Sequence, residues 1–266
     1  MKDQPEDNKE EEYVPTPEDF LFDEEESEED FKKKKSKKRL FRLIGICLVL
    51  LLLLQVANIW FNLYSSDNRE LVRTSDELSQ LENINEFKEA VVTIQGNGGR
   101  GTGFNIHPEG LILTNHHVID SRDPIAAIFP NGEILHAEVM KSDVDLDVAL
   151  LRVQSEEDLP YLRFQIEDAK QSEKIYVIGN PLTQTQIINE GEILNNEFPF
   201  QVLKISNAIF PGHSGSPVLS QKGEVVGVVY ARTIPSLRSG EESEGLAIPI
   251  ERVLEVFPEL KEIHVP

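Results

Sequence analysis

The stretch Pro211-Gly212-His213-Ser214-Gly215-Ser216-Pro217-Val218 places a serine in a glycine-flanked turn ahead of an apolar run, Val225–Val229. A serine hydroxyl becomes a good nucleophile only when a base takes its proton and N–H groups receive the charge on the substrate oxygen. Gly212 allows the backbone to turn so that its own N–H and that of Ser214 can point at one spot. Such a turn also describes an ordinary loop, so the motif needs a histidine and an acid elsewhere.

Both residue types lie upstream in suitable patterns. Leu113–Ile119 ends a strand-like run with the letters Leu-Thr-Asn-His-His-Val-Ile, and Asp143–Arg152 carries aspartates into an apolar strand. The order His, Asp, Ser along the chain is one of several that build the same catalytic triad. Three matches in order are much more specific than any one of them.

These motifs resemble those of the trypsin-like serine proteases, and within them the HtrA/Deg group. The matching segments are Thr114–Val118, Asp147–Leu151, the turn at Ser214 and Glu244–Ile250, which is similar to the family's Gly-Phe-Ala-Ile-Pro. The resemblance implies an all-β fold of two packed six-stranded antiparallel barrels with the active site between them. It also implies a serine endopeptidase that acts on polypeptides through an acyl-enzyme and needs no cofactor.

By this resemblance Ser214 is the nucleophile, and His117 is the base that takes its proton and returns it to the leaving amine. His116 is the alternative base, although it occupies the position that the family leaves variable. Asp147 directly precedes the apolar strand, as the family pattern requires, and would hold the imidazole in the productive tautomer.

Asp143, Asp145 and Asp147 alternate, so in a strand all three would face the same side. Asp145 is therefore the alternative acid. The other reading of Asp143 and Asp145 is a solvated loop or strand edge.

The oxyanion hole would consist of the backbone N–H groups of Gly212, His213 and Ser214. Two residues depart from the family here: His213 stands where an Asn or Asp is usual, and Ser216 replaces a usual glycine. A histidine cannot serve as the anion that pairs with a newly freed N-terminal amine, so we do not expect activation by that kind of cleavage. We hypothesise that protonation of His213 disorders this loop.

The substrate pocket follows from the resemblance alone. Ala208 should lie near its base, and Val228, Val229 and Tyr230 along one wall. The absence of an acid at the base disfavours Lys or Arg as the substrate residue, and Val229 and Ile209 replace the residues that glutamyl endopeptidases use. We expect a small or medium apolar residue before the scissile bond.

The net charge of −21 is unevenly distributed. Residues 1–31 contain 15 acidic and 2 basic side chains, whereas residues 32–42 contain eight Lys or Arg and no acid. The hydrophobe-poor acidic tail should be disordered. From residue 43 onward the chain is again acidic, which argues against nucleic acid as a partner.

A nearly unbroken apolar segment follows the basic cluster. The nineteen residues Leu43–Phe61 would span about 28 Å as a helix, which is close to the thickness of a bilayer's hydrocarbon core, so we predict a transmembrane helix at residues 43–62. Basic residues crowd its N-terminal side, so the positive-inside rule predicts a single-pass cell-membrane protein with a cytoplasmic N-terminus. The alternative is a cleaved signal peptide. Cys47, the single cysteine, lies in this span, so the following domain has no disulfides.

The predicted organisation is a disordered cytoplasmic tail (1–31), a basic juxtamembrane segment (32–42), a transmembrane helix (43–62), a helical stalk or linker (63–89) and a protease domain (90–266). In the last segment short apolar runs alternate with turn signals such as Asn131-Gly132 and Lys222-Gly223, and a helix is predicted at Ile250–Phe257. Only about fifteen residues follow Ile250, so we expect no C-terminal PDZ domain of the kind HtrA relatives carry.

No metal site is predicted, because His107, His136 and His264 lack metal-ligand spacing. The expected partners are polypeptide substrates, the bilayer and, by the resemblance, further copies of the chain in a trimer. The alternative function is a weakly catalytic protease-fold module that binds or chaperones proteins at the membrane surface.

Overall fold

The structure is a computed structural model that describes residues 28–64, 66–81, 83–97, 99–165, 169–181, 184–194, 202–233 and 243–263. It forms two compact units, Met1–Ser65 and Ser66–Pro266. The predicted disordered tail lies outside the described residues up to residue 27, as does His264. The second unit begins at Ser66, so it includes residues that the sequence assigns to a stalk.

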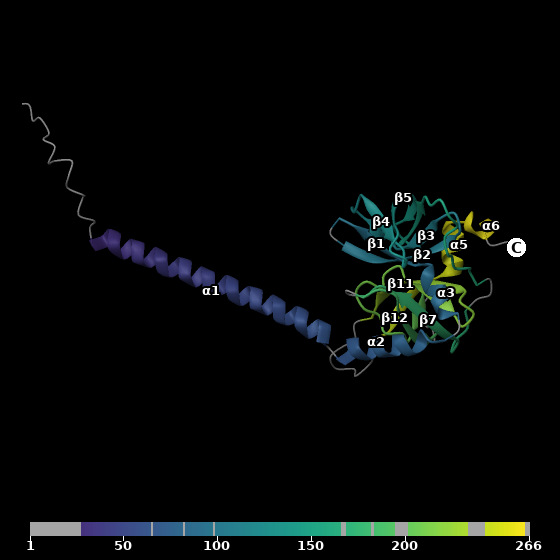
Figure 1. Cartoon of the computed structure of the whole chain (residues 1–266), viewed down its shortest axis with the longest axis horizontal. Helices are drawn as coiled ribbons and strands as arrows, with labels where there is room; N and C mark the ends of the chain where they lie inside the picture. Colours follow the sequence, from purple (N-terminus) through teal and green to yellow (C-terminus); the bar gives the residue numbers. More distant parts are fainter. Residues whose placement is uncertain are drawn as a thin grey trace, which may run out of the picture. The chain divides into compact units, whose positions relative to one another are not determined.

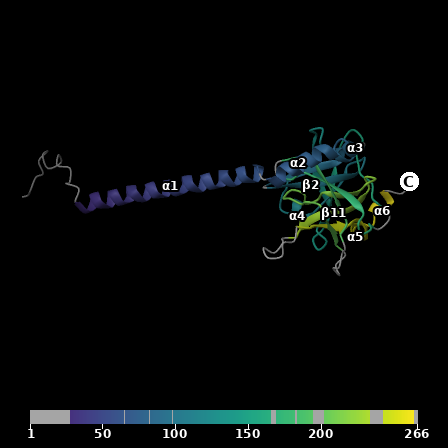
Figure 2. The same cartoon turned by 90° about the horizontal axis from the view of Figure 1, so that it is seen from below.

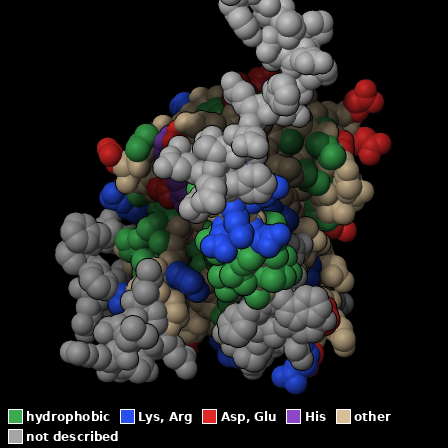
Figure 3. Space-filling view, turned by 90° about the vertical axis from the view of Figure 1, so that its left-hand side faces the viewer, with side chains coloured by type: hydrophobic (Ala, Val, Ile, Leu, Met, Phe, Trp, Pro, Cys, Tyr) green, Lys and Arg blue, Asp and Glu red, His purple; other side chains and the backbone are tan. Residues whose placement is uncertain are grey.

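The first unit contains one long helix, α1 (Glu28–Tyr64). Its segment Lys34–Ala57 is long and apolar enough to cross a membrane, and every side chain of that segment is exposed. Figure 3 shows Lys and Arg side chains gathered directly beside a band of hydrophobic ones. By length and composition, this helix is consistent with the predicted anchor.

The second unit is mostly β. Its strands are β1 (Val91–Gly96), β2 (Gly99–His107), β3 (Leu111–Thr114), β4 (Ile125–Ile128), β5 (Ile134–Asp143), β6 (Val148–Val153), β7 (Lys174–Gly179), β8 (Ile187–Glu192), β9 (Leu203–Ile205), β10 (Pro217–Ser220), β11 (Val225–Arg232) and β12 (Gly245–Pro249). Its helices are α2 (Ser66–Leu78), α3 (Ile84–Glu89), α4 (His116–Ile119), α5 (Ile250–Val256) and α6 (Leu260–Ile263).

The strands form two antiparallel sheets (Figure 1). The first closes into a barrel in the order β1-β2-β3-β6-β5-β4, and the second has the order β8-β7-β10-β11-β12-β9. A bridge between Ile193 and Ile205 joins the two ends of the second sheet, which is curled into a half-barrel. The predicted all-β fold of two six-stranded barrels is confirmed.

The continuous apolar runs in the sequence arise because strands such as β3 and β6 are buried on both faces. In β6, Ala149 and Leu151 point into the first barrel, whereas Val148 and Leu150 belong to a separate cluster between the sheets. A third cluster fills the second sheet. Alternate residues of one strand therefore serve two cores.

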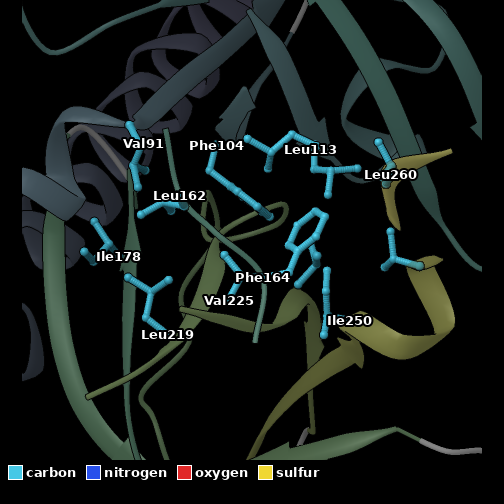
Figure 4. Packing of buried hydrophobic residues seen from close by; sticks show 14 of the residues in the cluster. Val91, Phe104, Leu113, Leu162, Phe164, Ile178, Leu219, Val225, Ile250 and Leu260 are labelled. Carbon is cyan, nitrogen blue, oxygen red and sulfur yellow. The ribbon is translucent and has the colours of Figure 1, made fainter. Parts of the chain in front are cut away.

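The cluster between the sheets holds them together. Phe104 and Leu113 come from the first barrel, and Ile178, Leu219 and Val225 come from the second sheet. Figure 4 shows these side chains pointing toward one another, with Ile250 and Leu260 from the C-terminal helices closing one side. Residues carried by the two sheets are thus fixed relative to each other.

Helix α2 packs against β8, at the end of the second sheet. Figure 2 shows α2 on the outside of the second unit. Leu71 and Ser75 are buried there, and the backbone N–H of Ile188 donates to Ser75 Oγ at 3.1 Å. An edge strand has backbone groups that need partners, and Ser75 supplies one. Residues 66–78 are therefore a structural part of the second unit.

The short apolar runs of the sequence correspond to ten of the twelve strands in the described part of the chain, and β5 and β10 are the two that they do not indicate. In β5 only Ala137 is buried, so no apolar alternation identifies the strand. β10 has four residues and directly follows the serine turn. The turns at Asn131-Gly132 and Lys222-Gly223 do connect strands, as predicted.

Candidate active site

His117 lies in α4, the single helical turn that follows β3. Its backbone N–H donates to Asp147 Oδ1 at 2.9 Å, and its Nδ1 lies 2.7 Å from Asp147 Oδ2. The carboxylate therefore fixes both the backbone and the ring. A proton on Nδ1 donates to the carboxylate, which leaves Nε2 as the acceptor. The side chains are 47% and 25% exposed, so the pair opens toward solvent.

Asp147 occupies the last position before β6 with φ of 57°. This left-handed conformation is rare for residues other than glycine, but Asp and Asn adopt it more readily. Asn115 Nδ2 donates to the carbonyl of Asp147 at 2.8 Å and supports this geometry. The carboxylate thus reaches His117 from a tight turn rather than from a strand.

The alternative acid and base lie elsewhere. Asp143 ends β5, and its Oδ1 accepts the N–H of Leu146 at 2.7 Å. Asp145 is exposed in the same turn, so the three aspartates do not share one strand face. His116 contacts Ser142, with Nδ1 2.5 Å from Oγ. Of the two histidines and three aspartates, only His117 and Asp147 form a histidine–carboxylate pair in the described structure.

The turn around Ser214 is held by both sheets. The carbonyl of Ser214 accepts the N–H of Thr102 from β2 at 2.9 Å, and the N–H of Gly215 donates to Val229 of β11 at 2.8 Å. Gly215 has φ of 84°, and a Cβ there would lie 2.0 Å from the carbonyl oxygen of Thr102. Only glycine fits so close to β2.

Thr102 connects the first barrel to this turn. Its Oγ1 donates to the carbonyl of Gly212 at 2.7 Å and accepts the N–H of Asn180 at 3.0 Å. Thr102 is fully buried, so both hydrogen bonds are shielded from water. One side chain thereby ties β2, the end of β7 and the serine turn together.

Gly101 brings the histidine helix and the serine turn together. A Cβ at Gly101 would lie 2.7 Å from Val118 Cγ1 and 3.3 Å from the carbonyl oxygen of Ser214. Val118 directly follows His117, so α4 and the serine turn both contact Gly101. Within the described residues no hydrogen bond joins the Ser214 hydroxyl to the imidazole; such bonds are often long without substrate.

Phe210-Pro211-Gly212-His213 forms a β-turn. The N–H of His213 donates to the carbonyl of Phe210 at 3.0 Å, and Gly212 has φ of 103°. Proline second and a positive-φ glycine third are typical of a type II turn. The N–H of His213 is thus already used, whereas those of Gly212 and Ser214 have no partner among the described residues.

Residues 101–228, which contain His117, Asp147 and Ser214, match the family model described as a trypsin-like peptidase domain. The match covers 128 of the 266 residues, just under half of the chain. The resemblance to the HtrA/Deg group is confirmed by relatives that are described as DegP-like.

Two relatives are proteins described as "probable periplasmic serine endoprotease DegP-like". The one from Hahella chejuensis is 33% identical over 172 residues and the one from Pseudomonas fluorescens 34% over 171 residues. The matches cover 61% and 60% of this chain and 35% of each relative, so the chain spans about a third of their length.

The trypsin-like fold is also seen in the crystal structure of a serine endoprotease from Yersinia pestis. The superposition has a TM-score of 0.60 with 26% sequence identity. It covers 68% of this chain and 67% of the other.

His213 is wholly buried in the trypsin-like domain. Burial lowers the pKa of the His213 imidazole to about 4. The ring Nδ1 accepts the N–H of Phe210 at 3.0 Å. The imidazole is therefore neutral at pH 7.

The structure places the predicted pocket residues in different surroundings. Ala208 is exposed, and its carbonyl accepts Asn189 Nδ2 at 3.2 Å. Val228 and Val229 are fully buried in separate cores. Tyr230 is half-buried, and its pKa is raised by burial and then by the negative charge of Asp147.

Thr102, Gly101 and Asn115 support the site but were not predicted as functional. Asn115 belongs to the motif Thr-Asn-x-His, which is a usable signal. Gly101 belongs to a Gly-x-Gly-x-x-Gly pattern and lies opposite Ile94 where β1 pairs with β2. Nothing local marks Thr102, because its contact with Gly212 joins residues 110 positions apart. The described residues contain no group of three or more His, Cys, Asp or Glu that could hold a metal.

Proposed function

We propose that this protein is a serine endopeptidase in which Ser214, His117 and Asp147 form the catalytic triad. His117 Nε2 takes the hydroxyl proton while Ser214 Oγ attacks the peptide carbonyl, and Asp147 stabilises the imidazolium that forms. The imidazolium then protonates the leaving amine. Water hydrolyses the acyl-enzyme by the same route in reverse.

The observation that carries this proposal is the double contact between Asp147 and His117. A carboxylate that binds Nδ1 and the backbone N–H sets both the tautomer and the ring orientation that a general base needs. The N–H groups of Gly212 and Ser214 would stabilise the oxyanion. The N–H of His213, predicted as a third donor, is left out because it donates to Phe210.

The substrate would bind as an extended strand beside β11. β10 pairs with β11 from Pro217 to Leu219, whereas β11 continues to Arg232 and pairs there with β12. The part of β11 beyond Val229 therefore has an edge that a peptide backbone can join. We expect a small or medium apolar side chain before the scissile bond, next to Ala208.

We further propose that α1 anchors the enzyme in a bilayer with its N-terminus in the cytoplasm. The relatives described as periplasmic serine endoproteases support extracytoplasmic polypeptides as substrates. That these are exposed or misfolded proteins, and that the chain assembles into a trimer, are further parts of this proposal. Single cysteines at Lys37 and Gln221 in a Cys47→Ser background test the topology. In intact cells a membrane-impermeant maleimide should label only the second.

Labelling of the full chain in detergent with a fluorophosphonate probe tests the chemistry. We expect a single adduct on Ser214 and none in Ser214→Ala. Ser142→Ala is the matched control, because Ser142 also contacts a histidine, His116. A folded wild-type protein that stays unlabelled would favour the binding or chaperone function, and labelling of Ser142 would reassign the nucleophile.

A further inference from the structure

His213 and Phe210 are joined by two hydrogen bonds in opposite directions. The backbone N–H of His213 donates to the carbonyl of Phe210, and the N–H of Phe210 donates to His213 Nδ1, each at 3.0 Å. The two rings also pack, with centroids 6.2 Å apart. Both backbone groups of Phe210 are therefore satisfied by one residue, which closes the turn that contains Gly212.

This arrangement determines the tautomer of His213. Nδ1 accepts a hydrogen bond, so the single proton of the neutral ring is on Nε2. Nε2 is buried and has no partner among the described residues, and the same holds for Ser216 Oγ. A Cβ at Gly179 would lie 2.7 Å from His213 Cδ2 and 2.2 Å from Ser216 Oγ, so both groups face the same glycine.

Within the described residues, no charged side chain acts on the ring. The groups that the structure places against it are Phe210, Gly179 and Ser216, and the pKa of the ring is affected only by burial and by the Phe210 backbone. A buried, unpaired cation is strongly unfavourable. The site therefore favours a neutral imidazole that accepts a hydrogen bond and disfavours the charged imidazolium.

We infer that His213 is a positioning residue whose neutral Nδ1 locks the Phe210–Ser214 turn and so orients the N–H groups of Gly212 and Ser214 without a charge pair. This inference rests on the proposed function of that turn. A proton on Nδ1 would turn the acceptor into a donor that faces the N–H of Phe210. In acid the turn therefore loses the hydrogen bond from the Phe210 N–H to His213 Nδ1 and is no longer held in place.

Steady-state kinetics of the full chain in detergent test the inference. Asn at position 213 offers an oxygen acceptor near Nδ1, whereas Leu has similar bulk and no acceptor. We expect His213→Asn to retain kcat at pH 8 within about threefold, and His213→Leu to lower kcat about 100-fold with little change in KM, as for a lost oxyanion donor. An unchanged kcat in His213→Leu, or a rise in KM alone, would overturn the inference.

Nitrogen-15 NMR of selectively labelled wild-type protein tests the tautomer directly, with His213→Asn to assign the signal. At pH 7 we expect Nε2 protonated and Nδ1 bare, with titration near pH 4. A proton on Nδ1 at pH 7, or titration near the ordinary value of about 6.5, would overturn the lock while leaving an active enzyme. An inactive wild type with the expected tautomer would instead refute the proposed function alone.

Discussion

Asp147 binds His117 through both carboxylate oxygens, one to the backbone N–H at 2.9 Å and the other to Nδ1 at 2.7 Å. The acid therefore holds the position of the helical turn and the tautomer of the ring with one side chain. Because Asp147 has φ of 57°, its place in the turn favours a residue that tolerates the left-handed region.

The substitution Asp147→Asn separates the tautomer from the backbone geometry. Asn fits the same φ and can still bind the N–H of His117, but its amide favours the wrong tautomer of the ring. We expect kcat to fall about 10⁴-fold with an unchanged melting temperature, measured by peptide hydrolysis and calorimetry. Asp145→Asn is the control and should retain full activity; if both variants lose activity alike, the assignment of the acid is wrong.

Thr102→Val tests the connection between β2 and the serine turn. Val keeps the shape but leaves the Gly212 carbonyl and the Asn180 N–H without their partner. We expect a loss of about 2 to 4 kcal/mol in the free energy of unfolding and a lower kcat. Thr93→Val is the control. Thr93 is buried in β1 and its hydroxyl has no partner among the described residues, so this change should alter the free energy of unfolding and kcat only slightly. Equal effects in the two variants would contradict the connecting role.

Gly215→Ala and Gly132→Ala compare two glycines with nearly the same φ, 84° and 89°. At Gly132 a new Cβ meets nothing within 4 Å, so only the backbone conformation is penalised, by about 1 to 2 kcal/mol. At Gly215 it collides with β2, and we expect a loss of at least about 4 kcal/mol. Denaturant unfolding measures both, and a similar loss at the two sites would show that the close approach to β2 is unimportant.

Ser75→Ala should destabilise the second unit, because it leaves the buried N–H of Ile188 without an acceptor. The expected loss is about 1 to 3 kcal/mol. Thr74→Ala on the same helix, for which the described structure gives no side-chain partner, should have a much smaller effect. Hydrogen exchange at Ile188 provides a local readout: faster exchange in Ser75→Ala alone is expected, and unchanged exchange would contradict the contact.

The depressed pKa of His213 predicts a loss of stability in acid. In the unfolded chain the ring takes a proton at about pH 6.5, whereas in the folded protein burial holds its pKa at about 4. The part of the free energy of unfolding that depends on neutral His213 is therefore fully present above about pH 6.5, and it is lost as the pH falls to about 4. It amounts to roughly 3 kcal/mol.

Unfolding free energies at pH 7.5 and 4.5 measure this effect. His213→Asn should reduce the decline between the two pH values, while His136→Asn, at an exposed position, should leave it as in the wild type. A decline of the same size in all three proteins would show that other groups cause it.

Most strands could be predicted from local patterns. A strand that is buried on both faces appears in the sequence as a continuous apolar run, and turn residues separate one run from the next. β5 could not be predicted in this way, because its exposed residues are a mixture of hydrophobic and charged types. The aspartate that contacts His117 was identified from its motif, but its turn conformation was not. A strand pattern around Asp143, Asp145 and Asp147 carries no information on a positive φ.

The order of residues along the chain specifies which chemical groups are present: a serine close to glycines, a histidine after a strand, an aspartate before a strand, and an apolar helix. Folding of the domain is needed to bring Thr102 to Gly212 and to pair the N–H of His213 with the carbonyl of Phe210. Strand periodicity is a local property. The pairing of distant segments depends on how two sheets close and pack, so it emerges only when the whole domain has folded.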